Sequence, residues 1–314
     1  MAKLLELLTS DVENSLENLT ALLACSKEEL FAEVRQMEQQ GLYFALENDH
    51  LYLIPELPLL NEKRLAEALK PYHVVVKPVI SSTNQYLLEN VTHLQKGDLC
   101  LAEYQTAGRG RRGRQWISPF AGQIIMSFYW QLDPRKPLDG LSTVIGLAIV
   151  QALVELDMYG FQVKWPNDIL VNGRKLVGIL TEMSGSMEEI SYIVMGIGVN
   201  VKTKQEELPE EIKQIATSLL MENVDIERTE AFKIILEELE HQYYDVLDSG
   251  FEDTLNEWRK LSVTLNQEIE VRAPGNTYEG VATDIDDDGN LLVKTTNGEV
   301  KRIVAGDVSI RPRK

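Results

Sequence analysis

Four arginines lie within six residues in a glycine-rich segment of this chain, Gly108-Arg109-Gly110-Arg111-Arg112-Gly113-Arg114. The planar guanidinium group of arginine matches phosphate oxygens in a two-pronged hydrogen bond, and glycine lets a backbone approach a ligand closely. The whole chain has a net charge of −18, so this positive cluster stands against an acidic background. We interpret the segment as a loop that closes over a phosphate group, with a solvated basic loop as the alternative.

Residues 108–113 also match the GxGxxG pattern of dinucleotide-binding folds. That pattern needs a strand before it and a helix after it, because the pyrophosphate sits at the N-terminus of the helix. A strand is predicted before the loop, but Gln115-Trp116-Ile117-Ser118-Pro119 follows it and leads into another strand. The sequence therefore disfavours a dinucleotide-binding fold.

A second candidate site lies on a predicted hairpin whose turn is Asn172-Gly173, two residues that tolerate positive φ. This turn pairs Leu170 with Lys175 and Asp168 with Val177. Asp168 and Lys175 are then diagonal neighbours on one face of the sheet, about 7–8 Å apart at Cα. A lysine in that place would neutralise charge that develops on a carboxylate and a phosphoryl group. An ordinary surface ion pair is the alternative.

A mixed fold must hold these residues together. A long helix is predicted within residues 137–159, and two closing helices over 230–248 and 251–260. Apolar runs predict strands over residues 73–80, 98–104, 123–132, 162–171, 175–183 and 190–199. Adjacent hairpins imply mostly antiparallel pairing, so we expect an α+β fold with a mixed, largely antiparallel sheet.

The two ends of the chain have a different character. Residues 1–60 predict three short helices, the third after Ser26, and then two strands around a turn at Asn48-Asp49, which is the winged helix-turn-helix pattern. The last 50 residues predict short strands over 268–272, 277–285, 290–295 and 299–304, which is typical of a small β-barrel. We therefore expect domains over residues 1–60, 61–264 and 265–314.

Composition excludes several classes of protein. No apolar run approaches the roughly 18 residues that span a bilayer, so no membrane association is expected. Cys25 and Cys100 are the two cysteines, which favours a reducing compartment, the cytoplasm, without disulfides. The four histidines stand far apart, so we expect no structural metal site.

Five segments resemble, in order and spacing, the biotin–protein ligases, and the resemblance covers essentially the whole chain. They are Ser81-Ser82-Thr83-Asn84-Gln85, residues 103–116, Lys164-Trp165-Pro166-Asn167-Asp168, Lys175-Leu176-Val177-Gly178-Ile179-Leu180 and Gly196-Ile197-Gly198-Val199-Asn200. The likeness is to the long bacterial form. That form implies a class II synthetase-like ligase core with a winged helix-turn-helix before it and an SH3-like barrel after it.

The resemblance implies a two-step reaction that uses biotin, ATP and Mg²⁺. The carboxylate of biotin attacks the α-phosphate of ATP, and a lysine of a carrier then attacks the resulting biotinyl-AMP. The implied partner is the biotin carboxyl carrier protein of acetyl-CoA carboxylase. A homodimer of the adenylate-bound form, built through the central sheet, is also implied.

The resemblance also implies roles for individual residues. Catalytic roles fall on Lys175, Arg111 and Asp168, where Asp168 either orients the incoming lysine or reaches Mg²⁺ through water. Biotin contacts fall on Ser82, Thr83, Asn84, Gln105, Arg109, Gly110, Arg111 and Lys175, and nucleotide contacts on Arg114, Trp116, Asn167, Gly198 and Asn200. Ser82 is alternatively a helix N-cap, a role that leaves its backbone donors exposed, and Trp116 is alternatively a core residue.

Two other functions remain open. A lipoate–protein ligase shares the adenylate strategy, although the arginine-rich loop resembles the biotin branch. A biotin-sensing repressor without ligase activity is the second, and the intact loop and Lys175 argue against it. Operator DNA is a candidate partner of residues 1–60, yet these carry three basic and eleven acidic side chains, a net charge of −8. Charge therefore opposes DNA binding, and a dimerisation or vestigial role is the alternative.

Overall fold

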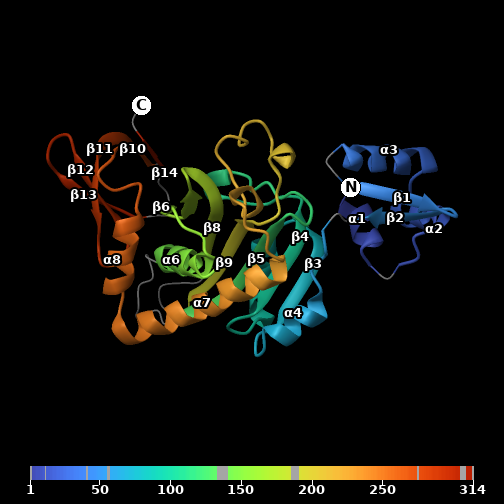
Figure 1. The fold of residues 1–314 in the computed structure, drawn as a ribbon, viewed down its shortest axis with the longest axis horizontal. Coiled ribbons are helices and arrows are strands. Elements are labelled where there is room, and N and C mark those ends of the chain that lie inside the picture. The colour runs from blue at the N-terminus through green and yellow to red at the C-terminus, as the bar shows by residue number, and fades with distance from the viewer. Residues whose placement is uncertain are drawn as a thin grey trace.

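The computed structural model describes residues 2–10, 12–39, 42–54, 57–132, 141–184, 191–273, 276–304 and 309–312. Within these residues the chain forms a two-stranded N-terminal ribbon, a seven-stranded central sheet and a five-stranded C-terminal sheet. The three lie in a row, with the N-terminal helices at one end and the C-terminal sheet at the other (Figure 1).

The N-terminal region has the predicted order of three helices and a hairpin: α1 (Ala2–Leu8), α2 (Leu16–Leu23), α3 (Lys27–Glu38), β1 (Tyr43–Glu47) and β2 (His50–Ile54). Ser26 begins α3 with a capping box, since its hydroxyl accepts from the Glu29 amide while its own amide donates to the Glu29 carboxylate. Asn48 and Asp49 both have positive φ, as the predicted turn requires. The helices bury a separate apolar cluster beneath the ribbon.

The central sheet has the strand order β3-β4-β5-β9-β8-β7-β6. Only β3 and β4 run parallel among these neighbours, so the expected α+β fold with a largely antiparallel sheet is confirmed. Its strands are β3 (Val74–Ile80), β4 (Leu99–Gln105), β5 (Gln123–Leu132), β6 (Phe161–Lys164), β7 (Asp168–Val171), β8 (Arg174–Ser184) and β9 (Ser191–Asn200).

The single strand predicted over residues 162–171 is wrong. The structure has two short strands there, β6 and β7, which pair antiparallel through a turn at residues 165–167. Pro166 lies in this turn, where it removes a backbone donor that a continuous strand would need. The turn brings Lys164 opposite Asp168.

The helices cover the two faces of the central sheet differently. The apolar face packs against α6 (Leu141–Val154), α7 (Arg228–Ser249) and α8 (Glu252–Leu261) around side chains such as Met126 and Ile197. At the N-terminal side α4 (Glu62–Ala68) packs on β3. On the opposite face α5 (Thr83–Glu89) buries Leu87 beside Tyr129. The rest of that second face is open for a site.

The C-terminal sheet consists of β10 (Glu268–Ala273), β11 (Asn276–Ile285), β12 (Leu291–Thr295), β13 (Val300–Ile303) and β14 (Ser309–Pro312), in the order β13-β12-β11-β10-β14. Four of these strands were predicted, and β14 was not. It is a four-residue edge strand that ends at a proline, so its sequence carries little alternation. Pro274 and Gly275, which separate the strands predicted over residues 268–272 and 277–285, lie outside the described residues.

A buried ion pair ties the segment before α4 to the central sheet. Arg228 and Glu103 are 4% and 1% exposed and lie 2.5 Å apart. Arg228 also donates to the Pro58 carbonyl at 2.6 Å, and the Glu103 carboxylate accepts from the Leu60 amide. The domain boundaries near residues 60 and 264 stay predictions. Within the described part of the chain no helix is long and apolar enough to cross a membrane.

Candidate functional site

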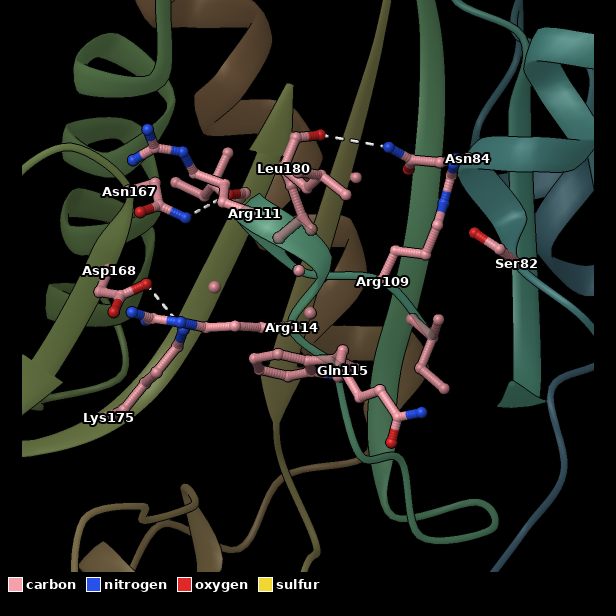
Figure 2. A pocket seen from close by; sticks show the side chains of 18 of the residues that line it. Ser82, Asn84, Arg109, Arg111, Arg114, Gln115, Asn167, Asp168, Lys175 and Leu180 are labelled. Atoms are coloured by element: carbon pink, nitrogen blue, oxygen red, sulfur yellow. Dashed lines mark hydrogen bonds and ion pairs between the residues drawn. The ribbon is translucent and has the colours of Figure 1, made fainter. Parts of the chain in front are cut away.

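The open face of the central sheet forms the floor of a cavity (Figure 2). Its walls come from the start of α5, the arginine-rich loop and the β6–β7 turn. Of the predicted site residues, all but Asn200 line it: Ser82, Thr83, Asn84, Gln105, Arg109, Gly110, Arg111, Arg114, Trp116, Asn167, Asp168, Lys175 and Gly198. The five motif segments therefore converge on one cavity.

The cavity floor is a row of residues that lie opposite each other on neighbouring strands. Asp168 of β7 pairs with Gly178 of β8, Gly178 pairs with Gly198 of β9, and Gly198 pairs with Ile125 of β5. Directly opposed residues share a face of the sheet. The two central positions are glycines, so the floor is low between the carboxylate at one end and the isoleucine at the other.

The hairpin register differs from the prediction at one pair. Leu170 pairs with Lys175 as expected, but Asp168 pairs with Gly178 and not with Val177. A β-bulge places one extra residue in β8, which reverses the face of every residue beyond it. Lys175 and Gly178 therefore both line the cavity, while Val177 is fully buried in the core.

Lys175 and Asp168 form an ion pair inside the cavity, with Nζ 2.7 Å from Oδ1 (Figure 2). Their side chains are 32% and 22% exposed, so the pair is neither a free surface contact nor fully desolvated. The predicted convergence of a cation and a carboxylate is present in the structure. Lys175 Nζ also lies 5.4 Å from the centre of the Trp116 ring.

The arginine-rich loop borders the same cavity with a short 3-10 turn over Arg111–Gly113. Arg112 and Gly113 have positive φ, and no α-helix follows, which contradicts a dinucleotide-binding loop. Arg112 donates to the Arg272 carbonyl of β10 at 3.0 Å. Burial lowers the pKa of Arg111, and the nearby carboxylate of Asp168 opposes that change. The hydrogen bond from Arg112 to Arg272 anchors the outer side of the loop to β10.

The other end of the cavity is polar. Ser82 is the N-cap of α5, accepting from the Gln85 amide at 3.4 Å, and it also lines the cavity, so the cap does not remove it from the site. The Gln105 side-chain oxygen accepts from the Thr83 amide at 2.9 Å. These residues are buried, and a ligand that reached them would exchange water for hydrogen bonds to protein.

Two residues at this end were missed. Ser127, fully buried on β5, has its hydroxyl 2.7 Å from Thr83 Oγ1 and 2.5 Å from Asn84 Oδ1. The Glu182 carboxylate accepts from Asn84 Nδ2 and from Arg109 Nη2, both at 2.8 Å. In the sequence, a polar residue within a predicted apolar strand could have indicated each of these two residues.

Three glycines make room for side chains of the site. A Cβ at Gly196 would lie 2.2 Å from Asn84 Oδ1, and one at Gly198 would lie 2.5 Å from the Trp116 ring. At Gly178 a Cβ would come within 2.7 Å of the same ring. These glycines let α5 and the loop approach the sheet closely. Gly198 therefore makes room for the Trp116 side chain, and not only for a ligand.

Asn200 lies behind the cavity. Its side chain, 4% exposed, donates to the Thr217 carbonyl at 2.8 Å and accepts from Gln123 at 2.8 Å. Asn167 lines the cavity and donates to the Ile179 carbonyl at 2.7 Å. Trp116 is half-buried over the floor, where it belongs to the site more than to the core.

Known proteins resemble this chain over nearly all of its length. Residues 76–200 match the biotin/lipoate A/B protein ligase family, and residues 264–311 match the biotin protein ligase C terminal domain. The chain is 33% identical over 312 residues to the bifunctional ligase/repressor BirA of Escherichia coli (strain K12), covering 98% of this chain and 96% of that protein. It is 32% identical to the BirA of Bacillus spizizenii, covering 94% and 93%.

A solved structure resembles the fold as well. The biotin protein ligase from Aquifex aeolicus in complex with biotin and ATP superposes with a TM-score of 0.66 and is 29% identical. It covers 77% of this chain and 99% of that one.

Proposed function

This chain belongs to the biotin protein ligase family, and from that premise we propose that it joins biotin to a carrier lysine through biotinyl-AMP. In the first step a carboxylate oxygen of biotin attacks the α-phosphorus of ATP, and the bond to pyrophosphate breaks. In the second step the neutral lysine amine attacks the acyl carbon, AMP leaves, and the amine gives up a proton.

One observation carries the proposal: a single cavity has a polar end, where Arg109 is paired with Glu182, and a cationic end. Ser82, Thr83, Asn84 and Gln105 stand at the first end, and five cationic side chains border the second and the loop above it: Arg111, Arg112, Arg114, Lys164 and Lys175. A ligand with a ureido group at one end and a carboxylate at the other fits this polarity. The same cations suit the triphosphate of ATP.

We assign the chemical step to Lys175 and Arg111. Lys175 would stabilise charge that builds up between the carboxylate and the α-phosphate, and Arg111 would fork onto a phosphate oxygen. Arg109 and Gly110 would lie along biotin, and Arg114, Trp116, Asn167 and Gly198 along the nucleotide. Asn200 would act from behind the cavity, since its side-chain amide is already bonded to Thr217 and Gln123.

Mg²⁺ would enter with ATP. Asp168 is the one carboxylate among the described residues that line the cavity, and Lys175 already occupies its Oδ1. Mg²⁺ in nucleotide sites typically takes one or two carboxylates together with phosphates and water. One carboxylate fits that pattern, so Asp168 would hold the ion jointly with the triphosphate.

The reaction is tested by exchange of labelled pyrophosphate into ATP. We expect exchange only when biotin, ATP and Mg²⁺ are all present, because pyrophosphate can return only through the adenylate. Lipoate replaces biotin in the parallel arm. Exchange with lipoate and none with biotin would assign the chain to lipoate ligation, the other activity within the matched family.

We also infer the acceptor protein, the cellular compartment and the oligomeric state. Biotin–[acetyl-CoA-carboxylase] ligases are among the relatives, including that of Mycobacterium tuberculosis at 34% identity over 68% of this chain. We infer that the acceptor is a lysine of a biotin carboxyl carrier protein. The two cysteines are unpaired, in keeping with the cytoplasm. Dimerisation of the adenylate-bound form through the central sheet stays a prediction, which sedimentation with and without biotinyl-AMP would test.

Repression of transcription is the second candidate function. It is favoured by the likeness to a bifunctional ligase/repressor, which extends through the N-terminal helices and the β1–β2 hairpin. In this proposal α3 enters the major groove of an operator when the protein holds biotinyl-AMP. Titration of labelled DNA from upstream of biotin-synthesis genes, with and without biotinyl-AMP, tests it. Equal, sequence-independent binding in both states would contradict it.

A further inference from the structure

Gln123 is a buried residue next to the site that neither the motifs nor the cavity lining include. It is 1% exposed and stands at the start of β5, directly opposite Asn200 of β9. Its side-chain oxygen accepts from Trp116 Nε1 at 2.9 Å. Its side-chain nitrogen donates to the Ile117 carbonyl at 3.0 Å and to Asn200 Oδ1 at 2.8 Å. Both ends of the amide therefore hold the segment that carries Trp116.

The Trp116 ring lies in a slot that constrains its plane. Gly178 and Gly198 form the bottom, and a Cβ at either position would come within 2.7 Å of the ring. Contact with two glycines sets how low the ring lies, but it does not decide which edge points into the sheet. The hydrogen bond from Nε1 to Gln123 decides that, because the indole has a single N–H donor.

Gln123 is itself held in place. Its backbone carbonyl accepts from Arg228 Nη1 at 3.2 Å, and Arg228 is locked in the buried pair with Glu103. Asn200, its partner across the strands, is fixed by the bond to the Thr217 carbonyl. A glutamate at position 123 would keep the acceptor for Trp116 but lose both donors, leaving buried acceptors without partners.

We propose that Gln123, supported by Asn200, is a positioning residue for adenylation that acts through Trp116. It fixes the indole ring over the floor of the cavity, beside Lys175, before the nucleotide arrives. The ring then presents a preformed wall to ATP, which lowers the entropic cost of binding. This inference rests on the proposed function, in which Trp116 packs along the nucleotide.

The test compares Gln123→Met with Gln242→Met by steady-state pyrophosphate exchange. Methionine keeps the length of glutamine and removes its hydrogen bonds. Gln242 is a matched control, a 7% exposed glutamine on α7 whose amide bonds only to Glu238 in the described structure. We expect Gln123→Met to raise the KM for ATP about five- to tenfold, the scale of one lost buried hydrogen bond. The KM for biotin should stay within about twofold, and Gln242→Met should leave both unchanged.

A double-mutant cycle with Trp116→Phe shows whether the effect passes through the indole. Phenylalanine has no N–H, so Gln123→Met should add little to the KM for ATP in that background. If the two effects simply add, or if Gln123→Met changes both KM values alike, the positioning role is wrong. Wild-type protein without biotin-dependent exchange would instead contradict the proposed function itself.

A second variant avoids the risk that Gln123→Met does not fold. Replacing Trp116 with 3-benzothienylalanine keeps the ring shape and exchanges the N–H for sulfur, while Gln123 stays in place. We expect the same selective rise in the KM for ATP. A KM for ATP equal to that of the wild type would overturn the proposal.

Discussion

Two regions of this chain are candidates to meet phosphate groups, and they carry opposite charge. The catalytic cavity is bordered by six lysines and arginines and one carboxylate among the described residues. Helix α3 of the N-terminal region exposes Lys27, Arg35 and Gln36 together with Glu28, Glu29 and Glu38. One region attracts a polyanion and the other repels it.

The difference teaches how each region could gain affinity. In the cavity, cations from separate strands and a loop converge on one small volume, where a single phosphate meets several of them at once. On α3 the charges lie along a convex, exposed helix, and Glu29 is fixed at its start by the capping box. Binding at the cavity can be dominated by charge, whereas binding at α3 would depend on base contacts and shape.

The largest expected effect comes from removing the cation at the centre of the cavity. Lys175→Ala should lower the rate of adenylate formation by at least about 10²-fold, the scale for one preorganised electrostatic stabiliser. Single-turnover formation of biotinyl-AMP measures it. Asp168 would lose the partner that now lies 2.7 Å away. Because the cavity would then have one cation fewer and an unpaired carboxylate near the triphosphate, the KM for ATP should rise as well.

The matched control is Lys233→Ala, since Lys233 is a half-buried lysine of α7 with a long ion pair to Glu237 at 3.8 Å. It should leave the rate unchanged. If Lys175→Ala kept the wild-type rate, the cations of the cavity would serve to bind the substrates and not to speed the reaction. The charge difference between the cavity and α3 would then concern affinity alone.

A smaller effect is expected from the loop that borders the cavity. Arg111→Gly should still form biotinyl-AMP but release it about tenfold faster or more, because a charged fork on the phosphate is lost and the loop gains conformational freedom. Dissociation of labelled biotinyl-AMP, together with labelling of bystander lysines, measures this.

A comparison with Arg112→Gly tests whether the faster release is specific to Arg111. Arg112 donates outward to the Arg272 carbonyl, so it anchors the loop to β10 without pointing at the phosphate centre. Its replacement should speed release less than that of Arg111. Release equally slow in wild type and Arg111→Gly would show that the loop does not retain the adenylate.

The sequence predicted which residues line the cavity better than it predicted their detailed geometry. The two-residue turns at Asn48-Asp49 and Asn172-Gly173 were predictable because such residues adopt positive φ locally. The bulge in β8 was not, since Leu176 and Val177 are both apolar and suit either register. Gln123, Ser127 and Glu182 were missed because they lie in largely apolar strands, and only packing shows that the open face of the sheet is polar.

The smallest expected effect concerns the salt dependence of DNA binding by the N-terminal region. Lys3 already donates to the Leu22 carbonyl, which leaves Lys27 and Arg35 as its other basic side chains. Each phosphate neutralised contributes about −0.9 to the slope of log K against log salt, so two contacts give about −2 per subunit. Fluorescence titration of operator DNA with adenylate-bound protein at several salt concentrations measures the slope. Arg35→Ala should flatten it by about one contact, whereas Lys233→Ala, far away on α7, should not. A slope several times steeper would mean that cations outside α3 reach the backbone, and that the acidic N-terminal region does not limit the affinity.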